Sequence, residues 1–362
     1  MLERKPFKRT RTEVTGVSIA TLRSLAVSHS LFAPTSLQLA VDRLGFVQAD
    51  PIRSPARAQD LILRHRVKDY RAGDLELRYP ELGIEEDVLY AYGFVSQEVW
   101  SVLHPRKASR LSAWERRVFD LVCELGQTHP RELEAHFGRR RVVNAWGGYS
   151  KATTHALDSL HYRGMLRISH RESGIRVYRP VDHSENRIAD QERLEKLILI
   201  VANTLAPVLE QTLYATTARF RYLGDHRGAI RRMVQTGKLR HEIADGLKYL
   251  WPASVKAPRS VPGKVRFLAP FDPLVWDRRR FEHLWKWAYR FEAYTPPAKR
   301  IRGYYAMPML WRDNIIGWAN AAYSGGNLKV ATGYIQKPPE DDQFDAELES
   351  EIGRLRLFLE SR

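Results

Sequence analysis

The sequence has little cysteine: Cys123 is its only one among 362 residues. A single cysteine excludes an intrachain disulfide and any zinc site built from several thiolates. Cys123 lies within the helical apolar pattern of Val118, Leu121, Val122 and Leu125, so we expect it to be a buried structural thiol. A chain without disulfides fits a reducing cytoplasm.

The sequence also lacks a long hydrophobic run. The longest, LILIVANTLAPVL at 197–209, is too short to span a bilayer and is interrupted by Asn203 and Pro207. The basic start MLERKPFKRTRTEV is not followed by the apolar stretch of a secretory signal. We therefore expect a cytoplasmic, nucleoid-associated protein with no membrane anchor.

Acidic residues are fewer than basic ones, 42 against 58, which gives a net charge of +16 and a pI near 9.9. This excess favours a polyanionic partner, and we expect nucleic acid, although a basic protein without such a partner has the same composition. A content of 44% hydrophobic and 28% charged residues is typical of a folded globular protein. The histidines show no metal-ligand spacing, so we predict no metal and no other cofactor.

The length predicts two to four domains. We expect a mainly α chain with β-hairpins, an α+β fold of tandem winged-helix domains followed by a mixed α/β module. Helical periodicity predicts helices over 17–31, 35–44, 54–67 and 186–212, and in the third of these Ser54 precedes Pro55 at the first helical position. The expected domains are an N-terminal winged-helix-like domain (1–108), a winged helix (109–185), a helical spine with a third small winged-helix-like module (186–256) and a C-terminal α/β domain (257–362).

The second domain has the clearest pattern. Ser112 and Glu115 form a capping box before an amphipathic helix, a short helix ends at Gly138, and a third helix ends at Gly164. Two alternating strands follow, joined by the turn 171–174. Three helices and a hairpin predict a winged helix, which usually places its third helix in the major groove of DNA.

Basic and polar side chains around this third helix and its wing are candidate phosphate contacts. The alternative is a solvated charged face, and winged helices also bind proteins. The candidates in this domain are Arg139, Arg140, Arg141, Lys151, Thr153, Arg163 and Arg171.

Gln48 and Asp50 interrupt the apolar run LGFV and precede Pro51. On an extended strand, residues two apart share a face, so Gln48 and Asp50 point together while Ala49 packs behind with the core. Phe46 is expected on the same face as the pair. An amide and a carboxylate so placed can hold one water for attack on a carbon that becomes cationic. The alternative is ordinary turn chemistry, with Asp50 capping the turn.

Several stretches resemble one family, the YcaQ/AlkZ-like winged-helix DNA glycosylases that unhook interstrand crosslinks. They are LGFVQADPI, RAQDLILRHR, YSKATTHALDSLHYRGMLRI, FLAPFDPLVWDRRRFEHLW and YRFEAYTPPAKRIRGYYAMPML, and the likeness runs from about 17 to 336. The resemblance implies tandem winged helices that form a DNA cradle, and a monofunctional glycosylase acting on N7-alkylated purines. It places the catalytic pair of the Gln-aliphatic-Asp branch at Gln48 and Asp50. A cradle within one chain needs no partner subunit, so we expect a monomer on alkylated or crosslinked double-stranded DNA.

The sequence departs from the family in VLYAYGFVSQEVW, which lacks the histidine of a His-Glu-Ala stretch found in crosslink-unhooking members. Tyr92 in this stretch either stacks on a displaced base or packs in the core. Arg53 and Arg57, just after the catalytic pair, complete the expected DNA contacts. Asp272 is interpreted as part of a structural turn with salt bridges, not as a catalytic group.

The leading hypothesis is thus a repair glycosylase for alkylated purines. A non-catalytic winged-helix DNA-binding protein or transcription regulator is the alternative. A nuclease is disfavoured because the sequence lacks clustered carboxylates for Mg²⁺.

Overall fold

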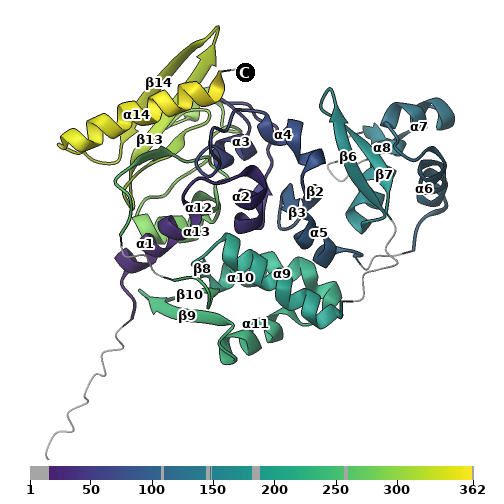
Figure 1. Ribbon diagram of the computed structural model, residues 1–362, viewed down its shortest axis with the longest axis horizontal. Coiled ribbons are helices and arrows are strands. Elements are labelled where there is room, and N and C mark those ends of the chain that lie inside the picture. Colours follow the sequence, from purple (N-terminus) through teal and green to yellow (C-terminus); the bar gives the residue numbers. More distant parts are fainter. Residues whose placement is uncertain are drawn as a thin grey trace, which may run out of the picture.

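The computed structural model describes residues 16–106, 110–143, 147, 149–181, 188–256 and 260–360. In this part of the chain no helix is both long and apolar enough to cross a membrane. Figure 1 shows residues 37–103 at the centre, residues 113–180 on the right, residues 190–252 below, and the C-terminal sheet with its long helix at the upper left.

The first unit surrounds a small antiparallel sheet of order β1-β3-β2. Ser36 caps its first helix, and Gly45 ends that helix in the left-handed conformation at φ +74°. The elements are α2 (Leu37–Leu44), β1 (Val47–Gln48), α3 (Ala58–Leu63), α4 (Asp74–Arg78), η1 (Tyr79–Glu81), β2 (Ile84–Val88), β3 (Tyr92–Ser96) and α5 (Gln97–Leu103).

The helix expected over 54–67 is shorter than predicted. It begins at Ala58, with Arg57 at the N-cap, and ends at Leu63. Ser54 does not cap it, because Ser54 N–H donates to the Ala56 carbonyl (3.3 Å) within the preceding loop. The chain from Pro51 to Arg57 is therefore a loop between β1 and α3.

The second unit confirms the predicted winged helix. The capping box of Ser112 and Glu115 is present, and Gly164 ends the third helix at φ +82°. The elements are α6 (Ala113–Leu125), α7 (Pro130–Phe137), β4 (Arg141–Val143), β5 (Tyr149–Lys151), α8 (Ala152–Arg163), β6 (Leu166–Glu172) and β7 (Ile175–Pro180).

Cys123 is exposed, so its predicted burial was wrong. The buried stripe of α6 is Val118, Leu121 and Val122, whereas Leu125 is 46% exposed. Position 123 follows Val122 by about 100° of helical rotation, which turns it away from that stripe.

The third unit is a helical module with a three-stranded sheet of order β8-β10-β9. The helix expected over 186–212 begins at Asp190 and ends at Thr204, because Pro207 has no N–H with which to continue it. The elements are α9 (Asp190–Thr204), β8 (Val208–Leu209), α10 (Glu210–Thr217), η2 (Ala218–Leu223), α11 (His226–Gln235), β9 (Leu239–Ala244) and β10 (Leu247–Pro252).

The C-terminal unit is an antiparallel sheet of order β11-β12-β13-β14. Phe344, Leu355 and Phe358 of its long helix α14 are buried in the same core as Met307 and Met309 of the sheet. The elements are β11 (Val265–Phe267), α12 (Pro273–Trp276), α13 (Arg278–Trp285), η3 (Pro297–Lys299), β12 (Met307–Trp311), β13 (Asn314–Ser324), β14 (Asn327–Tyr334) and α14 (Asp342–Leu359).

Helix α1 (Ile19–Ser30) lies against this C-terminal unit, where Leu22 and Leu25 share a buried core with Leu274 and Phe281. A buried ion pair adds a second link, because Arg66 donates to both carboxylate oxygens of Asp272 at 2.8 and 3.1 Å. The units are thus packed together through apolar contacts and charges.

Candidate functional site

Gln48 and Asp50 are positioned by the short strand β1. Gln48 pairs with Gly93 of β3, and the Ala49 N–H donates to the Tyr92 carbonyl at 3.0 Å, so the pairing continues to Ala49. Gly93 allows this close approach, since a Cβ there would lie 2.2 Å from the Val47 carbonyl oxygen. Phe46, expected on the face of the pair, is buried and packs its ring against Tyr90.

Asp50 is half-buried at the start of the loop. Its N–H donates to Gln59 Oε1 (3.3 Å), and its carboxylate Oδ1 accepts from the Ile52 N–H (2.9 Å). Asp50 therefore makes the capping contact with the turn that was the alternative interpretation of this residue. Burial nevertheless raises the pKa of Asp50 above its ordinary value, and the Ile52 N–H opposes this only in part.

Gln48 presents an unsatisfied amide oxygen. The side chain is half-buried, and its Oε1 is buried without a hydrogen-bond partner among the described residues. Buried polar atoms are nearly always paired, so an unpaired one is an available acceptor for a ligand or water.

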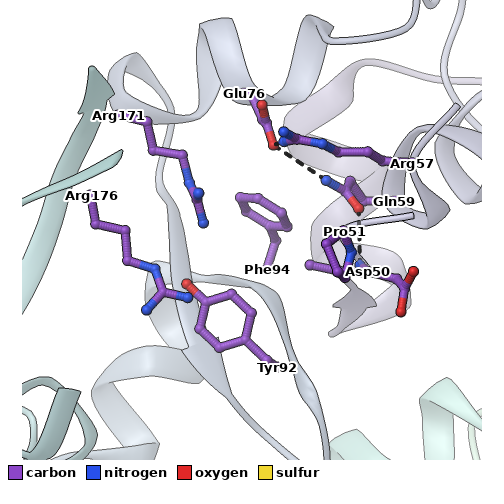
Figure 2. A pocket seen from close by; sticks show the side chains of 10 residues that line it. Asp50, Pro51, Arg57, Gln59, Glu76, Tyr92, Phe94, Arg171 and Arg176 are labelled. Atoms are coloured by element: carbon purple, nitrogen blue, oxygen red, sulfur yellow. Dashed lines mark hydrogen bonds and ion pairs between the residues drawn. The ribbon is translucent and has the colours of Figure 1, made fainter. Parts of the chain in front are cut away.

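The Asp50 carboxylate faces the C-terminal unit. Figure 2 shows it directed away from Tyr92 and Arg176. Its charge reaches Tyr305: burial, and next the charge of Asp50, raise the pKa of Tyr305 well above its ordinary value. Tyr305 is buried, and its hydroxyl has no hydrogen-bond partner in the described part of the chain.

A pocket of about 270 Å³ lies on the other side of the loop (Figure 2). Gln59 ties its wall to Asp50, because the Gln59 amide donates to Glu76 (3.4 Å) while its oxygen accepts from the Asp50 backbone. Arg57 forms an ion pair with the same Glu76. The lining residues are Ala49, Asp50, Pro51, Arg57, Gln59, Glu76, Tyr92, Phe94, Arg171 and Arg176. Ala49 and Asp50 both line this pocket and Gln48 does not. This differs from the expected arrangement, in which Gln48 and Asp50 share a face and Ala49 packs behind them, because the strand β1 ends at Gln48.

The far wall of the pocket comes from the wing of the second unit. Arg171 donates to both oxygens of Glu86 at 2.7 and 2.6 Å, and the Tyr92 hydroxyl bonds the same carboxylate. The guanidinium of Arg176 lies 4.4 Å over the Tyr92 ring. Glu86 is 1% exposed. Arg171 and Tyr92 are therefore held in a structural cluster at the pocket, and Arg171 does not project freely from the wing.

Two other expected DNA contacts are placed differently from the prediction. Thr153 is only 2% exposed, so it was wrongly expected at the surface. It lies in the first turn of α8, whose inner face packs on the rest of the winged helix and on β2. Arg163 lies 3.6 Å from Glu115 and bonds Ser159, which holds it along the helix surface.

The remaining candidates are exposed. Arg53, Arg139, Arg140, Arg141 and Lys151 all face solvent. Glu134 lies 2.5 Å from the Lys151 ammonium and 3.8 Å from Arg139 Nε, which gathers these cations at the start of α8. Among the described residues, no three His, Cys, Asp or Glu side chains are grouped so as to hold a metal ion.

Sequence reasoning did not single out Gln59, Glu86, Arg176 or Tyr305. Gln59 and Tyr305 lie in stretches that carry the family resemblance, and this resemblance was the one signal in the sequence that could have pointed to them. Glu86 and Arg176 meet across two domains, and no local pattern reveals that contact. Asp272 is buried and accepts the Leu274 N–H at 3.0 Å besides Arg66, so the structural interpretation of this residue is confirmed.

The comparisons with known proteins agree with this fold. The family described as DNA glycosylase AlkZ-like matches residues 41–358. Among solved structures, the DNA glycosylase AlkZ of Streptomyces sahachiroi is similar with a TM-score of 0.60, over 95% of this chain and 97% of that one, at 13% identity. That likeness confirms the predicted fold class. Because the family match covers most of the sequence, the chain belongs to the AlkZ-like family of DNA glycosylases.

Proposed function

We propose that this member of the family hydrolyses the N-glycosidic bond of N7-alkylated purines in double-stranded DNA, with Gln48 and Asp50 positioning the attacking water. The substrate is a duplex, which the +16 charge of the chain favours. The proposed enzyme is monofunctional: water, not a protein amine, attacks the sugar.

The chemistry follows from the leaving group. An N7-alkylated purine already carries positive charge, so it departs with the electron pair of the bond and needs no prior protonation. The sugar C1′ then becomes oxocarbenium-like, and a nearby carboxylate stabilises that charge. Water forms the new C1′–O bond and passes its proton to Asp50, while the Gln48 amide fixes the orientation of the water.

The observation that carries this proposal is the state of the Asp50 carboxylate. It is half-buried, and burial raises its pKa, which suits a group that must accept a proton. The unpaired Gln48 Oε1 close by in the chain supplies an acceptor for a water hydrogen. The turn contact to Ile52 is compatible with this role, because it uses Oδ1 alone.

The same step at C1′ would unhook an interstrand crosslink joined through purine N7. The stretch from Val88 to Trp100 lacks the histidine of crosslink-unhooking relatives, so we propose simple N7-alkyl adducts as the main substrate. A duplex carrying one defined crosslink tests this preference beside a duplex carrying N7-methylguanine.

The test is mass-spectrometric detection of free N7-methylguanine after the purified protein is incubated with methylated duplex DNA. We expect release by the wild type and almost none by Asp50→Asn. No release by the wild type, together with tight binding to one DNA sequence, would support the regulator instead. Equal release by both proteins would refute the role of Asp50.

A further inference from the structure

The backbone of Asp50 takes its hydrogen bond from a side chain at the point where the strand ends. β1 ends at Gln48, and the Ala49 N–H still donates to the Tyr92 carbonyl of β3 at 3.0 Å. The next N–H, that of Asp50, donates instead to the amide oxygen of Gln59 at 3.3 Å. Gln59 thus supplies the acceptor that a neighbouring strand would supply if the ladder continued.

The amide of Gln59 is bonded at both ends, as the dashed lines in Figure 2 show. Its side chain is 2% exposed, and Nε2 donates to Glu76 Oε1 at 3.4 Å. Arg57 forms an ion pair with the same oxygen of Glu76. Because an ionised carboxylate can only accept, the nitrogen of the amide must face Glu76, which leaves the oxygen facing Asp50. The neighbours of Gln59 therefore fix which way its amide points.

The helix that carries Gln59 is firmly held. All residues of α3 are buried. Asp60, the next residue, accepts the Tyr70 hydroxyl at 2.7 Å and the Gly73 N–H at 3.1 Å, which ties α3 to the start of α4. A side chain on such a packed helix keeps a nearly constant position, as a group that sets the geometry of a site must do.

Two other constraints on Asp50 come from its own loop. The Ile52 N–H donates to Oδ1 at 2.9 Å, and Pro51 favours an extended backbone at the residue before it. Both constraints would move with the loop if the loop shifted. Of these three contacts, the one from Gln59 is the contact that ties Asp50 to a packed helix.

We infer that Gln59 is a positioning residue for base release, which holds the backbone of Asp50 so that its carboxylate keeps its place beside the attacking water. Gln59 acts through Asp50 and needs no contact with the DNA. The inference rests on the proposed function, in which Asp50 accepts the proton of the water. A buried amide that only stabilised the fold would leave the rate per folded molecule unchanged.

The experiment measures the single-turnover release of N7-methylguanine from a duplex by Gln59→Met, together with the Kd for the same duplex without the lesion. Methionine keeps the length of the side chain and removes both hydrogen bonds. We expect release to slow by about 10- to 100-fold, because a small displacement of a reacting group costs rate. The Kd should stay within about twofold of the wild-type value, since an interaction made only in the transition state is lost.

Gln38→Met is the matched control. Gln38 is the second residue of α2, as Gln59 is of α3, and it donates to Asp42 at 2.9 Å and to the Gly83 carbonyl at 3.4 Å. The same substitution there also removes hydrogen bonds from a helix of the first unit. We expect release at the wild-type rate, and urea unfolding gives the folded fraction to which each rate is normalised.

The double variant Gln59→Glu/Glu76→Gln exchanges the two groups and keeps the net charge. A carboxylate at position 59 still accepts the Asp50 N–H and can also accept from the amide at position 76. We expect this variant to recover most of the rate lost in Gln59→Met. This rescue keeps the inference testable even if the methionine variant does not fold.

Release by Gln59→Met as fast as by Gln38→Met would overturn the inference, and so would a double variant that releases base no faster than Gln59→Met. A slow Asp50→Asn beside a normal Gln59→Met would refute the inference alone. A wild type that releases no base would refute the proposed function and this inference with it.

Discussion

At the scale of single residues, two aspartates of this chain have opposite surroundings. Asp272 is 0% exposed and receives two hydrogen bonds from Arg66, so it is paired with a buried cation. Asp50 is half-buried without a cation bonded to it among the described residues, and burial raises its pKa. A carboxylate whose charge the fold does not stabilise is typical of a functional group.

The contrast predicts opposite effects of the same substitution on stability. A carboxylate whose pKa is raised in the folded state stabilises only below its unfolded pKa, and this contribution is lost as pH rises. At pH 7 the charge of Asp50 therefore opposes folding, so Asp50→Asn should melt at the same temperature as the wild type or higher. Asp272→Asn should lower the free energy of unfolding by about 3–5 kcal/mol, because it leaves Arg66 buried without its partner. Urea unfolding checks both, and a destabilised Asp50→Asn would contradict the assignment.

The rate of base release should depend on the ionisation of Asp50. Only the ionised carboxylate of Asp50 can accept a proton from the water, so the rate of base release falls as pH drops through the pKa of Asp50. This pKa is raised above its ordinary value of about 3.9. Single-turnover rates on N7-methylguanine duplex from acidic to neutral pH measure this limb. The residual rate of Asp50→Asn should lack it, and the same limb in both proteins would assign the ionisation to another group.

Residue-level prediction from sequence succeeded for the strand that leads into Gln48 and for the turn contact of Asp50, which local rules decide. Strand alternation did not extend past Gln48, because β1 ends there and Ala49 and Asp50 line the same pocket. Cys123 was misplaced because it lies one position beyond the buried stripe of α6. Thr153 was misplaced because the first turn of α8 is covered, which depends on packing that the local pattern of α8 does not show.

At the scale of elements, the site depends on the close pairing of β1 with β3. Gly93 lies opposite Gln48, and a Cβ at this position would meet the Val47 carbonyl at 2.2 Å and the Phe46 ring at 2.7 Å. The strand that leads into Gln48 and Asp50 is therefore fixed by the absence of one side chain.

Gly93→Ala should push β1 away from β3 and displace both Gln48 and Asp50 from their present positions. The expected cost is about 1–3 kcal/mol of unfolding free energy, the range for overpacking, with a loss of base release in the protein that remains folded. Gly353→Ala in α14 is the matched control, since a Cβ there meets nothing within 4 Å. This control should be neutral or more stable by up to about 1 kcal/mol. Thermal melts and release assays on both variants measure the difference, and equal behaviour would disprove the role given to Gly93.

Helix ends followed the sequence where a cap or a glycine specified them, as at Ser112 and Gly164. The start at Ala58 and the stop at Thr204 were not predicted. At the first boundary the expected cap Ser54 is engaged in the preceding loop instead. At the second the apolar spacing continued past Pro207, which has no N–H to extend the helix.

At the scale of the whole molecule, the units share their cores. One apolar cluster contains residues of the first, second and C-terminal units, and a second joins the first unit to α9 and α11. Buried charges lie between units as well, since Arg171 of the second unit donates to Glu86 of the first at 2.7 and 2.6 Å. Within the first unit, His104 Nε2 lies 2.6 Å from the buried Asp87 carboxylate, and Arg106 donates to the same group at 3.0 Å. The tandem architecture was predictable from repeated helix and hairpin patterns, whereas these contacts required the three-dimensional structure.

The buried histidine predicts loss of stability in mild acid. Burial lowers the pKa of His104 from 6.5 to about 4, so the unfolded chain binds this proton first as pH falls. Its contribution is complete above pH 6.5 and is lost as pH falls toward 4, with about 2 kcal/mol lost between pH 7 and pH 5. His65 and His161, whose pKa values are also lowered by burial, act in the same direction. Urea unfolding at the two pH values should show a smaller loss for His104→Gln than for the wild type, and identical losses would argue against a neutral buried His104.

The most direct test of the catalytic claim separates chemistry from binding in one substrate, a duplex with a single N7-methylguanine. Single-turnover rates and dissociation constants are measured for the wild type and for Asp50→Asn. We predict that the rate of the variant is lower by at least about 100-fold, the range for a lost general base. Its DNA affinity should be no weaker than that of the wild type. A variant that releases the base within twofold of the wild-type rate would show that Asp50 does not direct the water.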